Sequence, residues 1–247
     1  MSDLQSCLGT KYLQQTQFER EKIMAMPRLH ISPAAPFKTY PDAKTCLLPD
    51  AERPATDLWD VLSSRRSRRR YADHVLSLEV LSALLWAAQG MSSRSGGVTL
   101  RTFPSAGALY PIETYLQIRR VEGLEPGLYH LNVRDWCLET LQTGEFGTHL
   151  AKACLDQRFM AQAAFNVCWS AVLRRNMAKY GHRGMRYIFM EAGHVCQNLL
   201  LAAEGLELSA CPVGAYFDQE VNDLFALDGE EESLIYFASV GSRGGQG

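Results

Sequence analysis

Two periods of hydrophobic and polar positions run along the chain, and they predict where helices and strands lie. In residues 77–90, "SLEVLSALLWAAQG", leucines recur at helical spacing, with Ser77 at the expected N-cap and Gly90 as the stop. Residues 56–65 predict a shorter helix that begins at Thr56. The stretch "YPIETYLQIRRV" instead alternates apolar and polar side chains from Ile112 to Ile118, which predicts a strand.

The rest of the chain mixes helices and strands without a regular alternation. Residues 127–141, "GLYHLNVRDWCLETL", predict antiparallel strands around an Asn-Val-Arg-Asp turn, and residues 166–173 predict a buried strand. Residues 146–165 have helical spacing. The clearest helix covers residues 186–207, with Gly205 expected at the C′ position, and residues 233–241 predict a last buried strand. This order predicts an α+β fold.

The N-terminal part differs in composition from the rest. Six of the ten prolines lie between Pro27 and Pro54, which predicts an arm or leader over residues 1–55 and a compact domain over residues 56–247. The first residues lack the layout of a signal peptide, and no apolar run reaches the length of a membrane span. Seven scattered cysteines without a CxxC pair favour a reducing compartment. We therefore expect a cytoplasmic protein that does not contact a membrane.

Charge is concentrated in one place. The stretch "RRSRRR", residues 65–70, holds five arginines in a chain whose formal net charge is only -2. Such guanidinium groups suit a phosphate monoester. The alternatives are a solvated surface and a nucleic-acid patch, although the balanced overall charge disfavours a nucleic-acid partner. The sequence has no GxGxxG motif after a strand, no Walker loop and no HExxH spacing, so it predicts no Rossmann site and no metal site.

Two further segments consist of small residues. "FPSAGALYP", residues 103–111, and "SACPVGAYFDQ", residues 209–219, are expected to be loops in which backbone groups approach a flat ligand closely. Each loop alone is typical of a turn. Their combination with the arginine segment is what favours a binding site.

The order of the motifs carries a resemblance. From about Tyr40 to Arg243 the chain presents "RRSRRRY", "PSAGALYPIE", "GLYH", "KYGHRGMRYIFMEAGHVCQNLLLAAEGL", "CPVGAYFD" and "VGSR". In this order they resemble the SagB-type branch of the nitroreductase family. The resemblance implies a central antiparallel-rich sheet flanked by helices, a homodimer, and FMN bound at the dimer interface.

The resemblance also implies roles for individual residues. In the family's Arg-x-Ser-x-Arg element, which falls on Arg65, Arg66, Ser67 and Arg69, it assigns Arg65 and Ser67 to the phosphate and ribityl end and Arg69 to N1 and O2 of the flavin ring. Arg68 and Arg70 are then expected in solvent or in salt bridges. The remaining cofactor-binding residues that it implies are Pro104, Ser105, Ala106 and Gly107 beside the ring, Pro212, Val213 and Gly214 facing N5, and Arg243 at the phosphate.

Lys179 and Tyr180 match a Lys-Tyr pair that, in relatives oxidising peptide thiazolines and oxazolines, helps to remove a proton from the substrate carbon. The alternative is a solvent-facing lysine beside a core tyrosine. Four functions stay open at this point. They are an NAD(P)H-dependent reductase of nitro compounds or quinones, an azole-forming peptide dehydrogenase, an enzyme that fragments flavin, and a nucleic-acid binder.

Overall fold

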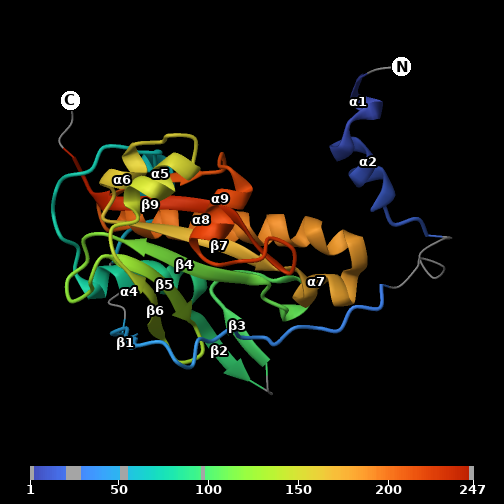
Figure 1. Ribbon diagram of the computed structural model, residues 1–247, viewed down its shortest axis with the longest axis horizontal. Coiled ribbons are helices and arrows are strands. Elements are labelled where there is room, and N and C mark those ends of the chain that lie inside the picture. The colour runs from blue at the N-terminus through green and yellow to red at the C-terminus, as the bar shows by residue number, and fades with distance from the viewer. Residues whose placement is uncertain (1–2, 21–28, 51–54, 96–97, 245–247) are drawn as a thin grey trace.

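In the computed structural model, residues 3–20, 29–50, 55–95 and 98–244 are described, and the account below concerns these residues. They form an α+β fold around one seven-stranded sheet, with strand order β1-β6-β5-β4-β7-β9-β8 and antiparallel pairing throughout (Figure 1). The prediction of an antiparallel-rich sheet flanked by helices is confirmed. The strands are β1 Thr45–Leu47, β4 Ile112–Ile118, β5 Gly127–Asn132, β6 Cys137–Thr143, β7 Phe165–Val172, β8 Leu208–Val213 and β9 Glu232–Ser242.

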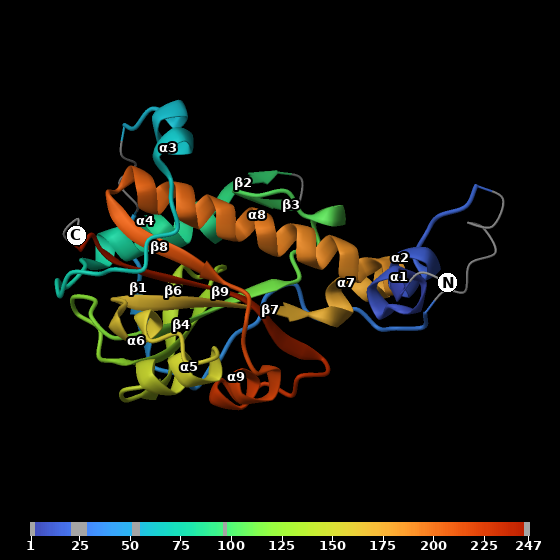
Figure 2. The same cartoon turned by 90° about the horizontal axis from the view of Figure 1, so that it is seen from above.

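Helices cover both faces of this sheet. Figure 2 shows α4 and α8 on one face and α5, α6 and α9 on the other. A separate ribbon of β2 and β3 lies beside α8, and α1 and α2 extend from the body next to α7. The bounds are α1 Asp3–Ser6, α2 Leu8–Gln15, α3 Leu58–Ser64, α4 Leu78–Gln89, β2 Met91–Ser95, β3 Val98–Arg101, η2 Ala106–Ala108, α5 Gly147–Ala153, α6 Phe159–Gln162, α7 Leu173–Tyr180, η3 Gly181–Arg183, α8 Gly184–Gly205 and α9 Asp218–Leu224.

The alternation in the central strands divides the interior into two cores. On β4, Ile112 and Leu116 pack with α4 and α8, whereas Tyr115 points to the opposite face and packs with α5, α6 and α9. Both sets of side chains are fully buried. The polar positions that alternate with the leucines and isoleucines of β4 are therefore buried as well, which the sequence pattern did not indicate.

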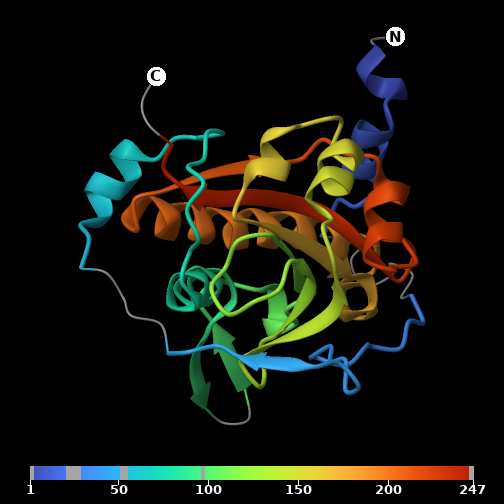
Figure 3. The same ribbon diagram turned by 60° about the vertical axis from the view of Figure 1, so that its left-hand side comes forward.

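Part of the predicted leader adds to the sheet. Residues 45–47 form the edge strand β1, which pairs with β6, and residues 29–50 run along the body (Figure 3). Lys38 Nζ donates to Glu232 Oε2 at 2.6 Å and to the Tyr115 hydroxyl at 2.7 Å. Burial opposes the charge on Lys38, but the Glu232 carboxylate outweighs it and raises the pKa of Lys38. This ion pair ties the segment to the centre of the sheet.

Four local predictions need correction. Asp57, not Thr56, caps α3, because its carboxylate accepts from the backbone N–H groups of Trp59 and Asp60. The helix expected over 146–165 is two helices, α5 and α6, since Leu155 and Asp156 both adopt a left-handed backbone between them.

The end of α8 also differs from the prediction. Gly205 is still helical, and the left-handed residue that follows is Glu207, with φ of 57°. Residues 209–213, expected in a loop, belong to β8, because they pair with β9 from the edge of the sheet. The loop in that segment begins only at Gly214.

The cap of α4 gives a direct test of the helix boundaries. Ser77 Oγ accepts from the backbone N–H of Val80, as predicted. Ser77→Ala should lower the free energy of unfolding by about 1 kcal/mol, because that N–H loses its partner. Ser77→Asp should keep most of the stability, since aspartate also caps. Urea denaturation measures both, and equal destabilisation by the two substitutions would contradict the cap.

Candidate functional site

The arginine segment lies along the ends of the last two strands. Residues 65–70 are extended, and the backbone N–H of Arg68 donates to the carbonyl of Ala210 on β8 at 2.9 Å. Tyr71 forms a β-bridge with Arg243, and Ala72 bonds to the carbonyl of Ser242. The backbone thus places Arg243 beside the arginine segment, although 173 positions separate it from Arg70 in the sequence.

One carboxylate joins two of these arginines. Glu204, in the last turn of α8, accepts from Arg68 and, at 2.8 Å, from Arg243 Nη2. Burial works against its charge, but Arg68, Ser64 and Arg243 outweigh that effect and lower the pKa of Glu204. The expectation of a salt bridge for Arg68 is confirmed. Arg243 also pairs with the Glu204 carboxylate, so part of its guanidinium group already has a partner within the protein.

The other arginines of the segment leave cationic groups accessible. Arg66 folds back onto the carbonyls of Ser63 and Arg65, and Arg69 lies 5.7 Å from the centre of the Phe159 ring. Within the described part of the chain, no carboxylate pairs with Arg65 or Arg69. Ser67 is exposed between them. Guanidinium groups and a hydroxyl without a counter-ion suit a phosphate.

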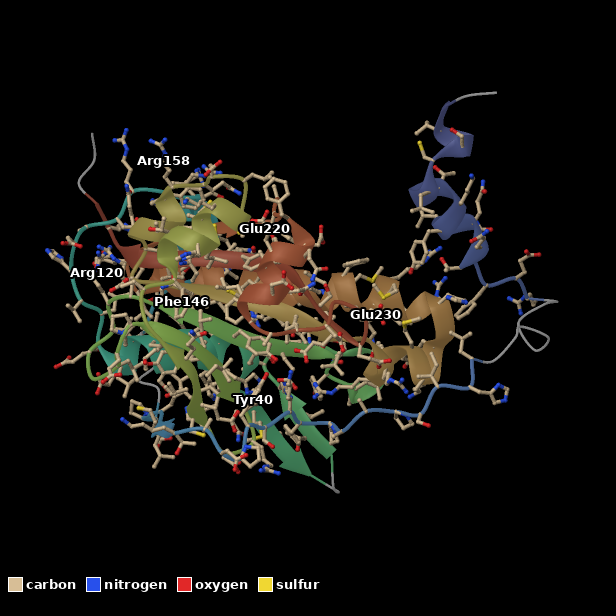
Figure 4. All side chains as sticks on the ribbon, viewed as in Figure 1. Tyr40, Arg120, Phe146, Arg158, Glu220 and Glu230 are labelled. Carbon is tan, nitrogen blue, oxygen red and sulfur yellow. The ribbon has the colours of Figure 1, made fainter. Side chains whose placement is uncertain are left out.

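Further positive charge lies at this end of the molecule. Figure 4 shows Arg120 and Arg158 on the side where the arginine segment runs. Arg120 is paired with Asp73, whereas no described carboxylate pairs with Arg158. Such a concentration of cations attracts any phosphorylated ligand, because the field of several charges adds in front of the surface.

The segment of Pro212, Val213 and Gly214 lies on the same half of the molecule. Val213 ends β8 and is buried, Pro212 is half-buried, and Gly214 is exposed at the start of the following loop. Arg69 acts electrostatically on Cys211, the residue just before Pro212. Cys211 is therefore near the arginine segment, and Gly214 is exposed three positions further along the chain.

The loop of residues 103–111 lies elsewhere. It contains the short helix η2, and Ser105 Oγ accepts from the backbone N–H of Tyr110 at 2.9 Å. Pro104 and Gly107 are exposed, while Ser105 and Ala106 are half-buried. Gly107 has φ of 65°, so this position favours glycine on conformational grounds.

Lys179 and Tyr180 meet this loop. A Cβ at Gly107 would come within 2.7 Å of both Lys179 Nζ and the Tyr180 hydroxyl. Lys179 Nζ lies 5.3 Å from the centre of the Tyr180 ring, and that ring packs edge-on against Tyr187 of α8. The lysine is exposed at the end of α7. The two predicted catalytic residues and the predicted flavin loop therefore form one group.

A single chain does not bring the two groups together. Glu204, which holds Arg68, lies seventeen residues beyond Tyr187, which packs on Tyr180. At the rise of an α-helix this corresponds to about 25 Å along α8. Figure 2 shows α3 and the start of the arginine segment near one end of α8 and η2 towards the other. The predicted site residues therefore fall into two groups, here called half-sites, that are anchored near opposite ends of α8, although Arg65 is close enough to act electrostatically on Cys196 in the middle of that helix.

Sequence reasoning missed three kinds of participant. Glu204 was not predicted, because the local stretch "AAEG" contains no sign of its partners Arg68 and Arg243, which are distant in the sequence. Glu191, in the motif "EAGH", is buried under the loop of residues 103–111. Arg175 donates to Glu113 Oε1 at 2.5 Å and to the carbonyl of Tyr110 at 3.0 Å, so it joins the sheet to that loop. These contacts connect residues distant in sequence, which no spacing rule predicts.

Within the described residues, no cluster of three or more His, Cys, Asp or Glu side chains is arranged to hold a metal ion. No helix among the same residues has the length and apolar character needed to cross a membrane.

Comparison with known proteins places these features in context. The model of the nitroreductase family matches residues 62–242. The protein MJ1384 of Methanocaldococcus jannaschii, which is named as a nitroreductase, is 39% identical over 186 residues, covering 75% of this chain and 91% of that protein. The microcin B17-processing protein McbC of Escherichia coli is 28% identical over 158 residues, covering 62% of this chain and 57% of McbC.

A solved structure shares the fold over nearly the whole chain. A protein of Anabaena variabilis, also named as a nitroreductase, superposes with a TM-score of 0.78 and 27% identity, covering 95% of this chain and 47% of that one. The chain thus spans little more than half of McbC and about half of the Anabaena protein.

The shared carboxylate of Glu204 can be tested by its pH dependence. Because its pKa is lowered in the folded state, Glu204 contributes stability above about pH 4.5, and that contribution is lost as the pH falls. Glu204→Gln should lower the free energy of unfolding at pH 7 by about 1 kcal/mol, since the arginines are partly exposed. Urea denaturation at pH 7 and pH 3.5 should show a smaller difference at the lower pH. Glu207→Gln, an exposed neighbour, serves as the control, and a loss that is equal at both pH values would contradict the role of Glu204.

Proposed function

This chain belongs to the nitroreductase family, whose members are oxidoreductases that generally bind flavin, and from that premise we propose that it is an FMN-dependent oxidoreductase acting as a homodimer. The observation that carries the proposal is the division of the candidate site into two half-sites along α8. The side chains that anchor the two halves, Glu204 for the arginine segment and Tyr187 for Tyr180, lie about 25 Å apart along α8, which favours a second copy for a ligand that contacts both halves.

Exposed apolar side chains support a two-fold contact along α8. Phe189 and Met190 of α8 are 55% and 59% exposed, and Trp59 of α3 is 75% exposed. Large apolar groups gathered on one side favour an interface. In a two-fold dimer the same surface meets itself, so antiparallel α8 helices would bring the arginine end of one subunit to the Gly107 end of the other.

The donor set fits FMN. Arg65, Ser67 and Arg243 would hold the phosphate, and Arg69 would lie near N1 and O2 of the ring, where a cation stabilises negative charge. Arg66 would support this element from the side. The backbone after Pro212 and Val213 would present the N–H of Gly214 or its neighbour towards N5. Pro104, Ser105, Ala106 and Gly107 of the other subunit would close the ring from the remaining side.

Bound FMN would supply hydride transfer at N5. The chain's own residues would fix the ring and leave one face open, so that NAD(P)H and a small acceptor such as a nitro compound or quinone occupy the same position in turn. Such shared use of one face explains why the sequence needs no Rossmann motif, since a nicotinamide has only to stack over the ring. The cytoplasmic location expected from the sequence would supply NAD(P)H.

A second function has one specific observation in its favour. Lys179 and Tyr180 lie against Gly107 with the lysine exposed, where they could meet a substrate over the ring. Oxidation of a peptide thiazoline or oxazoline to an azole removes a proton from carbon as the hydride leaves, and a lysine can take that proton. Similarity to McbC, a microcin B17-processing protein, supports the same direction. We rank it second because the chain matches MJ1384 over more of its length.

The absorbance spectrum of the purified protein separates the remaining alternatives. Bound FMN gives a yellow protein, which a nucleic-acid binder using the arginine segment would not be. An enzyme that fragments flavin would lose the yellow colour on reduction in the presence of oxygen. A stable yellow colour with NAD(P)H-dependent reduction of a quinone supports the proposed reductase.

A mixing experiment tests the composite site. Arg65→Ala with Arg69→Ala damages one half-site, and Gly107→Val damages the other, because its side chain would collide with Lys179 and Tyr180. Each variant alone should lose most of its FMN, since a charge-assisted contact contributes roughly 1.5–3 kcal/mol. Unfolding and refolding the two together should restore about a quarter of the sites, because half of the random dimers carry one intact site. FMN retained after dialysis is the readout.

The matched control is each variant refolded alone, which should recover none. If the mixture binds no more FMN than the separate variants while all remain folded, the two half-sites do not combine across subunits.

Lys179 separates the two leading functions. Lys179→Ala should lower azoline oxidation by about 10²–10⁴-fold, the usual effect of removing one general base, while FMN content stays unchanged. The rate of quinone reduction by NAD(P)H should persist, because hydride transfer between nicotinamide and flavin needs no such base. Steady-state rates for both reactions are compared with those of Lys152→Ala, an exposed lysine on α5. Equal losses in both reactions would mean that Lys179 only shapes the pocket.

A further inference from the structure

Glu191 differs from every other buried glutamate among the described residues. Glu113, Glu139, Glu204 and Glu232 each accept hydrogen bonds from cationic or polar side chains. Glu191, in the middle of α8, is 2% exposed, yet neither of its carboxyl oxygens has a hydrogen-bond partner at normal distance. A buried carboxyl without a partner is costly to the fold, so its presence calls for an explanation.

The surroundings of Glu191 are the underside of the loop of residues 103–111. Ser105 faces its carboxyl from the loop, and Arg101 of β3 and Arg175 of α7 are the cations near it. The buried residues of α4, which packs along α8, are uncharged. Burial raises the pKa of Glu191 to about 7, against the opposing effects of Ser105, Arg101 and Arg175.

Both arginines are already engaged in holding the loop or its neighbours. Arg175 donates to the carbonyl of Tyr110 and to Glu113. Arg101 donates through Nη1 to Gln89 Oε1, and its backbone N–H donates to the Tyr110 hydroxyl. The hydroxyl proton of Ser105 is different, because Ser105 Oγ only accepts, from the N–H of Tyr110. Ser105 therefore has a proton to donate to an ionised Glu191.

We propose that Glu191 is a positioning residue, which acts through Ser105 to set how tightly the loop of residues 103–111 is held against Lys179 and Tyr180. When Glu191 is ionised, it accepts the hydroxyl proton of Ser105 in a charge-assisted hydrogen bond. That bond polarises Ser105 Oγ and makes it a better acceptor for the N–H of Tyr110. When Glu191 is neutral, this support is lost and the loop loosens at Gly107.

The inference rests on the proposed function only in what the loop does during turnover. The titration of Glu191 near neutral pH and the response of the loop do not require bound FMN. In turnover, the pH profile of kcat/KM should show a limb near pH 7 in the wild type that Glu191→Gln lacks, because the loop no longer changes with pH.

Amide hydrogen exchange tests the loop directly. In the wild type, the protection of the Tyr110 N–H, corrected for the intrinsic exchange rate, should rise about threefold between pH 6 and pH 8, within what one hydrogen bond contributes. Glu191→Gln should abolish this rise, because the amide keeps one charge state. Ser105→Ala should abolish it too, since the connection is removed. Glu122→Gln, an exposed glutamate, is the control and should behave as the wild type.

The pH dependence of stability is the second measurement. A carboxyl whose pKa is raised in the folded state stabilises the protein below its unfolded pKa, and that contribution is lost as the pH rises towards 7. Glu191→Gln should therefore raise the melting temperature more at pH 8 than at pH 5.5. Ser105→Ala should keep a pH-dependent melting temperature but move that dependence to higher pH, because Ser105 lowers the pKa of Glu191 in the wild type.

The outcomes are distinct. A Tyr110 amide whose protection does not depend on pH in the wild type overturns the inference, even if FMN binds normally. A pH-dependent melting temperature with an unchanged loop shows that Glu191 titrates without positioning the loop, and this also overturns it. If the wild type binds no FMN, the proposed function fails, and the exchange experiment still decides the role of Glu191. Should Glu191→Gln fail to fold, the pH dependence of Tyr110 protection in the wild type and in Glu122→Gln still decides the inference.

Discussion

The contact between α8 and the sheet is the constraint on which the rest of the structure depends. Ile188, Val195 and Leu199 pack without exposure against the strands and α4, so the helix is held along its whole length. A helix fixed in this way is a rigid rod, and its ends cannot approach each other. Glu204 at one end receives the arginine segment, whereas Tyr187 near the other receives Tyr180. The distance between these two anchors follows from the length of this helix.

Buried charge is distributed so that nearly every group has a partner. His130 lies between Glu113 and Glu139, and Arg175 joins Glu113 to the loop that carries Tyr110. Burial opposes the charge on His130, but the hydrogen bonds that its ring donates to the two carboxylates outweigh this effect and raise the pKa of His130. Paired groups of this kind fix the register of the elements that they connect. The Glu191 carboxyl lies in the same interior without a hydrogen-bond partner among the described residues, and this contrast with the paired groups indicates a role other than holding elements together.

The segment before α3 contributes to the same polar interior. Tyr40, which is labelled in Figure 4, packs edge-on against His130 with ring centres 5.1 Å apart, and Lys38 donates a hydrogen bond to Glu232. Apart from the edge strand β1, the described residues of this proline-rich stretch form no helix or strand, and side-chain contacts hold them instead. The domain boundary predicted at residue 55 stays a prediction. Strand β1, Lys38 and Tyr40 lie before that boundary, yet all three contact the sheet.

How much the sequence determined depends on the range of the interaction. The alternation in residues 112–118, the cap at Ser77 and the apolar periodicity of residues 186–205 are local, so they predicted β4, α4 and α8 with nearly correct bounds. The motif order was sufficient to identify the family. Local signals were ambiguous where two neighbouring residues could both act as the N-cap of a helix. Thr56 and Asp57 are such a pair, and in the structure Asp57 caps α3. Only the tertiary structure decided that Arg68 and Arg243 share Glu204 and that Gly107 abuts Lys179. It also decided that the Glu191 carboxyl has no hydrogen-bond partner among the described residues. These contacts depend on which distant segments pack together. The spacing of residues along the sequence does not show which side chains will share a hydrogen-bond partner.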